Sequence, residues 1–177
     1  MNARRITIGS TVVALLCAGA SSLPAQGNDD APAITARVHG TFVDVRGGAG
    51  VLSGDMSILR FEVRNETVTA VGRIDGALAD SVGNVLGKVN EDLALPVGHI
   101  ESTCNQLRMD LSAADADVLG VRVHFDRETA GFDSRQGTTP KALRELCAVA
   151  DVLHGASTPA ARADALNAVA TAVRKPR

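Results

Sequence analysis

Apolar and polar residues alternate with a period of two in two neighbouring segments, residues 107–111 and 119–125. In the first segment three apolar residues fall on one face, and Arg108 and Asp110 fall on the other. Such alternation is typical of a β-strand with one buried face. Because a short polar stretch, residues 113–117, connects the two segments, we expect them to pair as an antiparallel hairpin.

Further short strands are predicted earlier in the chain, separated by turn residues. A hairpin is expected around Asn65-Glu66, and the glycine-rich residues 46–55 are expected to form a connection between strands. About seven short strands at spacings near ten residues are typical of an antiparallel β-sandwich or a partly open barrel. The predicted strands before residue 107 are 38–45, 59–64, 68–74, one ending near Leu78, 85–89 and 93–102.

Two helices are predicted after the strands. Thr138 or Thr139 can cap the first, residues 140–154, and Thr158 can cap the second, residues 159–173, with a proline following the cap in each case. Apolar residues recur at helical spacing in both segments. The predicted fold class is therefore α+β and mainly β, with an antiparallel sandwich or partly open barrel followed by two C-terminal helices.

The first 25 residues have the pattern of a secretory signal peptide. Arg4 and Arg5 precede an apolar run, and small residues follow it. We expect residues 26–35 to be a disordered leader and residues 36–177 to form a single β-rich domain. Loss of the two arginines would change the formal net charge from −2 to −4, which excludes a strongly basic nucleic-acid binder. We therefore expect a secreted or periplasmic protein without a membrane span after cleavage.

Two cysteines remain after the predicted signal peptide, Cys104 and Cys147. Cys104 precedes the strand at 107–111, and Cys147 lies on the apolar stripe of the first predicted helix. In an exported protein such a pair is best used in a disulfide, which would fasten the helix to the sheet. The closed loop would contribute about 4 kcal/mol in the chain-entropy description.

The segment from Leu93 to the second predicted helix resembles a group of small, uncharacterised secreted bacterial proteins. The shared pattern is carried by Leu95-Pro-Val97, by Cys104 with the strand that follows it, by Asp115-Ala-Asp-Val-Leu-Gly-Val121 and by Leu146-Cys-Ala-Val-Ala-Asp-Val-Leu-His-Gly155. The resemblance implies that the two cysteines belong to one architecture. It implies no activity, cofactor or catalytic residue.

The sequence offers few groups in a pattern that points to chemistry. His99 and His124 would form a zinc site only if their strands were neighbours, and the four histidines of the chain have no metal-ligand spacing. Asp115, Asp117 and Asp126 are weak candidates for calcium, because they gather near one predicted turn without an EF-hand pattern. No catalytic motif and no cofactor fingerprint is present, so no catalytic residue, metal or cofactor is assigned.

These observations predict an exported, non-enzymatic β-domain that acts as a binding or structural module of the cell envelope or extracellular space. The alternative is a carrier that holds a small apolar ligand in a barrel-like cavity. The expected partner is therefore an envelope protein or a small ligand and not nucleic acid. An enzyme is a third reading, which a pocket with convergent His and Asp side chains would favour.

Overall fold

The computed structural model describes residues 34–134, 138–155 and 158–174. These residues form one antiparallel sheet followed by two helices, so the predicted fold class is confirmed. The elements are β1 (Thr35–Val43), β2 (Ala49–Arg64), β3 (Thr67–Ala79), β4 (Val85–Thr103), β5 (Gln106–Leu111), β6 (Ala114–Val118), β7 (Val121–Phe125), β8 (Glu128–Asp133), α1 (Pro140–His154) and α2 (Pro159–Val173).

The sheet is partly ring-like because β1, the sixth strand in the strand order, also pairs with β2, the first strand. The strand order is β2-β3-β4-β5-β8-β1-β7-β6, and β1 pairs in addition with β2 over its whole length. The other edge of β1 is divided between β8, which pairs at Thr35 and Ala36, and β7, which pairs at Gly40 and Thr41. The pairing of β1 with β2 thus connects the six strands from β2 to β1 into a ring, and β7 and β6 continue the order beyond β1.

Apolar side chains fill the interior of the ring. Alternate residues of each strand point inward, as the period of two predicts, and many of them are completely buried. The largest of these side chains in the strands are Phe125, Leu52, Met56, Ile58, Ile74, Leu95, Leu107, Met109 and Leu111. The strands therefore share one packed core, which continues into the faces of the two helices.

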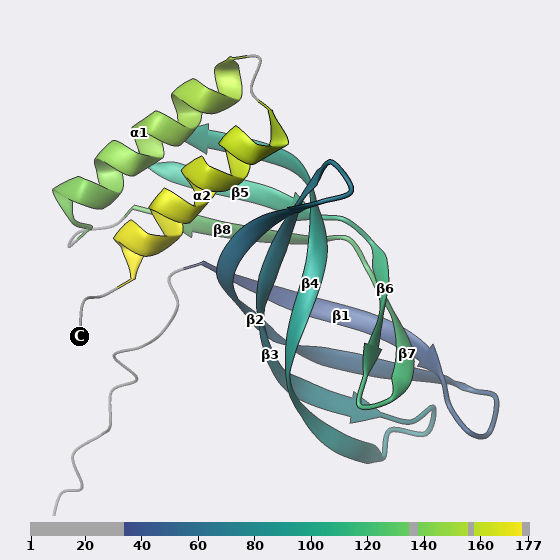
Figure 1. Cartoon of the computed structure of the whole chain (residues 1–177). Coiled ribbons are helices and arrows are strands. Elements are labelled where there is room, and N and C mark those ends of the chain that lie inside the picture. Colours follow the sequence, from purple (N-terminus) through teal and green to yellow (C-terminus); the bar gives the residue numbers. More distant parts are fainter. Residues whose placement is uncertain (1–33, 135–137, 156–157, 175–177) are drawn as a thin grey trace, which may run out of the picture.

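The helices lie side by side across one end of the sheet, and the connections β1–β2, β3–β4 and β6–β7 gather at the opposite end (Figure 1). Both helices begin as predicted: the Thr139 side chain accepts a hydrogen bond from the Ala142 N–H, and Thr158 does the same for Ala161. Leu146 of α1 and Leu166 of α2 are fully buried in the core. The helices therefore close the end of the ring that they cover.

A disulfide and a side-chain amide are among the contacts that tie the helices to the sheet. The predicted disulfide is confirmed, because Cys104 in the β4–β5 turn is bonded to Cys147 of α1. In α2, the Asn167 amide donates to the Phe61 carbonyl and accepts from the Phe61 N–H, both at 2.8 Å. Phe61 lies in the part of β2 that extends past β1, so Asn167 supplies the hydrogen bonds that a strand would otherwise supply.

The predicted hairpin between residues 107–111 and 119–125 is wrong. β5 pairs with β4 and β8, whereas β7 pairs with β6, which occupies the stretch predicted to be a polar connection. The reason is a tight turn at Leu119-Gly120, where both residues have positive φ, 50° and 77°. Two such residues form the turn that matches the twist of a hairpin. Leu119 is therefore an exposed turn residue and not an inward strand residue.

Other element boundaries also differ from the predictions. Most of the expected glycine-rich connection, residues 46–55, belongs to β2, and the strands expected at 85–89 and 93–102 form the single strand β4. The strand β8 was not predicted. Ile34 is buried and Thr35 begins β1, so the last part of the predicted leader belongs to the domain. The signal peptide predicted for residues 1–25 lies outside the described residues.

Candidate functional site

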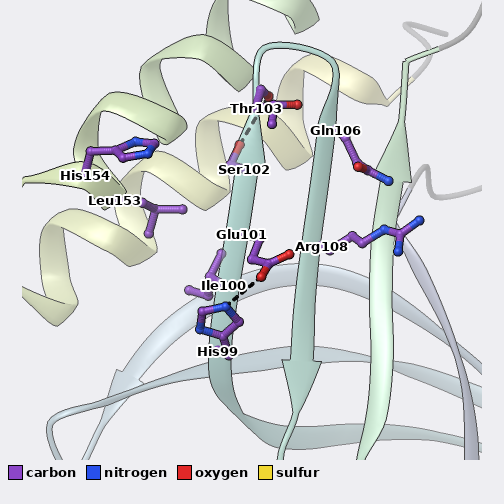
Figure 2. Close-up of a pocket in the computed structure, with 9 residues that line it drawn as sticks. All are labelled: His99, Ile100, Glu101, Ser102, Thr103, Gln106, Arg108, Leu153 and His154. Carbon is purple, nitrogen blue, oxygen red and sulfur yellow. Dashed lines mark hydrogen bonds and ion pairs between the residues drawn. The ribbon is translucent and has the colours of Figure 1, made fainter.

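A groove lies along β4 near the disulfide, with a volume of about 380 Å³. We call it the edge groove. Figure 2 shows Leu153 and His154 of α1 on one side of β4, and Gln106 and Arg108 of β5 on the other. The remaining lining residues come from β4 itself and are His99, Ile100, Glu101, Ser102 and Thr103.

The groove exists because β4 is longer than its neighbour β3. β4 has 19 residues and β3 has 13, and the last pair between them joins Pro96 to Thr69. From Val97 to Thr103, β4 pairs with β5 alone among the described strands. A bulge between Val97 and Ile100 marks the place where the pairing changes. One edge of this part of β4 is therefore without a strand partner.

The side chains along this edge alternate between two environments. Ile100 and Ser102 face the helix side, where the Ser102 hydroxyl lies 3.4 Å from the Leu146 carbonyl oxygen. His99 and Glu101 face the other way, and the His99 Nε2 lies 3.0 Å from a Glu101 carboxylate oxygen. Arg108 is the cross-strand partner of Glu101. The edge groove thus offers the apolar side chain of Ile100 on one face and the oppositely charged side chains of Glu101 and Arg108 on the other.

A second concave region, of about 530 Å³, lies beside β1 and β7. It brings together Asp115 of β6 and His124 of β7, whose Nδ1 lies 2.8 Å from the carboxylate. The hydrogen bond with His124, followed by the charges of His124 and Arg122, lowers the pKa of Asp115. Thr41 of β1 is the cross-strand partner of His124 on its other side. A histidine, a carboxylate and a hydroxyl thus stand in a row across three strands.

The cysteines, histidines and aspartates that the sequence offers as site residues do not come together in one site. Cys104 and Cys147 are joined, as predicted. His99 and His124 do not face each other, because β4 and β7 are not paired. Asp115 and Asp117 lie on β6, whereas Asp126 follows β7. Among the described residues, no group of three or more His, Cys, Asp or Glu side chains is placed to hold a metal ion, so the weak calcium candidates do not converge.

One buried carboxylate was not predicted. Asp44, in the β1–β2 connection, is only 8% exposed and accepts four hydrogen bonds. Two come from the backbone N–H groups of Arg46 and Gly48, both at 2.9 Å, and two come from the N–H and hydroxyl of Ser81, at 3.0 and 2.6 Å. Asp44 therefore holds the β1–β2 connection against the β3–β4 connection.

These hydrogen bonds, those from Ser81 first, hold the pKa of Asp44 far below its usual value of 3.8. Because the unfolded chain regains the usual pKa, it takes up this proton first as the pH falls. The stabilisation by Asp44 is therefore complete above the usual pKa and is lost as the pH falls from there toward the lowered value.

We expect Asp44→Asn to lower the free energy of unfolding near neutral pH and to make its decrease toward acid shallower. The amide keeps one acceptor but turns an N–H group toward the N–H of Ser81. Chemical denaturation between about pH 6 and pH 3 measures both effects. Asp75→Asn, the same change at an exposed position of β3, is the control. Equal acid slopes for wild type and Asp44→Asn would contradict the role of Asp44.

Comparisons with protein-family models, with curated protein sequences and with solved structures found no match to this chain. Within the described parts of the chain, neither helix is long and apolar enough to cross a membrane.

Proposed function

We propose that this chain is an exported, non-enzymatic β-domain whose edge groove binds an extended segment of an envelope or extracellular protein. The observation that carries the proposal is the unpaired edge of β4 from Val97 to Thr103, beside the groove. An unpaired strand edge presents backbone N–H and C=O groups that another strand can pair with. An extended peptide that adds itself to such an edge gains affinity from main-chain hydrogen bonds and specificity from neighbouring side-chain contacts.

The surroundings of the edge support a binding role because they are held in place. The disulfide joins the β4–β5 turn, one end of the edge, to Cys147 of α1. Leu153, two helical turns further along α1, lines the groove. Fixing both walls in advance lowers the entropy that is lost on binding. The disulfide also supports export, because such bonds persist mainly in oxidising compartments.

The side chains define which segments fit. Ile100 and Leu153 are apolar, whereas His99, Glu101 and Arg108 offer hydrogen-bonding groups of both charges. Because neighbouring residues of a strand point to opposite sides, a fitting segment would alternate apolar and polar residues. The carrier alternative is supported less well, since the inward side chains of the ring are packed against one another.

The test is site-specific photo-cross-linking in the cells that export the protein. A photoreactive residue at His99 or His154 should form an adduct with one other protein, and mass spectrometry should map the adduct to a segment of alternating apolar and polar residues. The same residue at Val51 of β2 should not form this adduct. Val51 is 49% exposed and is paired with Thr41 and Ala79, none of which lines the groove. Leu153→Arg, which places a bulky charge in the groove, should abolish the adduct. Leu59→Arg, the same change at a 36% exposed leucine of β2 outside the groove, should not.

Three results would contradict the proposal. Equal adducts at Val51 and His99 would show that the groove is not the binding surface. A small molecule retained in native mass spectrometry of freshly isolated protein would favour the carrier. Turnover in a hydrolase panel that His124→Ala abolishes would favour an enzyme that uses the Asp115–His124 pair.

A further inference from the structure

Six large aliphatic side chains are exposed at the end of the sheet opposite the helices. They come from the three connections that Figure 1 shows gathered at this end and from the adjoining ends of β1 and β4. We call them the loop-end patch: Val43 (77% exposed), Val45 (103%), Val82 (63%), Val85 (68%), Leu86 (56%) and Leu119 (47%). An apolar cluster of this extent on a protein surface usually marks an interaction site.

Hydrogen bonds hold the three connections of the patch together. Asp44 lies between Val43 and Val45, and its carboxylate is bonded to Ser81, the residue before Val82. On the other side, the Leu119 N–H donates to Glu91 of β4 at 3.3 Å. A side-chain atom added to Gly87 would lie 3.4 Å from Leu119, so the β6–β7 turn touches the start of β4. The segments that carry the patch are thus held near one another before any partner binds.

We propose that the loop-end patch joins two copies of this chain in a symmetric dimer. The exposed fractions of its six residues correspond to an area on the order of 600 Å², so two patches face to face bury at most about 1,200 Å², the lower end of specific protein interfaces. A two-fold interface needs a surface that is complementary to itself. The aliphatic patch meets this need, because any of its side chains can pack against any other.

The charges near the patch also fit a second copy better than a lipid surface. Three cations lie on these connections or next to them and are matched by three carboxylates: Arg46, Lys88 and Arg122 against Asp80, Glu91 and Asp117. A surface with balanced charges does not repel its own copy across a two-fold axis. Interfacial binding to anionic lipids, in contrast, depends on an excess of cations beside the apolar residues.

Sedimentation velocity over a range of protein concentrations tests the proposal. We expect protein purified from the cells that naturally produce it to dimerise with a dissociation constant in the micromolar range. Val45→Asp and Val85→Asp, made separately, each place like charges opposite each other in the dimer and should weaken it by about 100-fold or more. Val63→Asp makes the same change at a 43% exposed valine at the far end of β2 and should leave dimerisation unchanged.

Both patch variants alter exposed side chains, so thermal unfolding should show that each folds. Monomers at all concentrations, or equal weakening by Val63→Asp, would overturn the proposal. So would a monomer that sediments with phosphatidylcholine or phosphatidylglycerol vesicles and loses this binding in Val45→Asp. Neither patch variant alters the edge groove, so the results stay separable from those for the proposed function.

Discussion

Replacing both cysteines, Cys104→Ser with Cys147→Ser, is expected to lower the free energy of unfolding by about 2–5 kcal/mol. The bond links residues 43 positions apart, so it restricts a long loop of the unfolded chain. For a loop of that length the chain-entropy description gives about 4 kcal/mol. Urea unfolding of the wild type and the double variant, with and without a reducing agent, measures the difference.

The reducing agent serves as an internal control, because it should destabilise the wild type and leave the double variant unchanged. Hydrogen exchange should locate the effect. α1 and the β4–β5 turn should lose protection first, whereas the long hairpin of β2 and β3 should keep it. Free thiols at both Cys104 and Cys147, found by non-reducing peptide mapping of protein isolated from its native cells, would contradict the bond itself.

The helix starts and the β2–β3 turn could be predicted from the sequence, because each depends on a few adjacent residues. Thr139 with Pro140 and Thr158 with Pro159 begin their helices as capping predicts. The turn at Asn65-Glu66 joins β2 to β3, as its polar residues predict. In each case a few adjacent residues determine the conformation, so no knowledge of distant neighbours is needed.

The pairing of strands could not be predicted in the same way. A period of two shows which face of a strand is buried but does not identify its neighbours. Glycines were misleading for a related reason. Gly54 and Gly76 are paired with each other within β2 and β3, and a side chain on either would collide with the backbone of the opposite strand. They permit a close approach of two strands, whereas the sequence pattern assigns Gly54 to a connection.

The edge groove depends on the same long-range information. It results from the different lengths of β3 and β4, which the sequence pattern did not predict because it divided β4 into two strands. Asp44 lies between these cases. Its bonds from the N–H groups of Arg46 and Gly48 lie within one turn and are of the kind that Asp side chains often form there, so they were predictable in principle. The bonds to Ser81, 37 residues away, were not.

The interior of the ring distinguishes a packed module from a carrier, and Phe125 is the residue that tests it. Its side chain is 0% exposed and belongs to the core. In β7 it is paired with Gly40 of β1, where an added side chain would collide with Val123 and the His124 backbone, so the strands are closely packed at this point. In a packed core, removal of a phenyl ring forfeits its burial and leaves a cavity that the neighbours fill only in part.

We therefore expect Phe125→Ala to lower the free energy of unfolding by about 3–5 kcal/mol, measured by urea denaturation. His124→Ala changes the adjacent residue, which points to the exposed face and is hydrogen-bonded to Asp115 there, and should cost less than about 1 kcal/mol. Nile red, an apolar dye, should bind Phe125→Ala no more tightly than the folded wild type. A loss below about 1 kcal/mol for Phe125→Ala would contradict a packed interior, because a side chain that lines a ligand cavity has few contacts to lose.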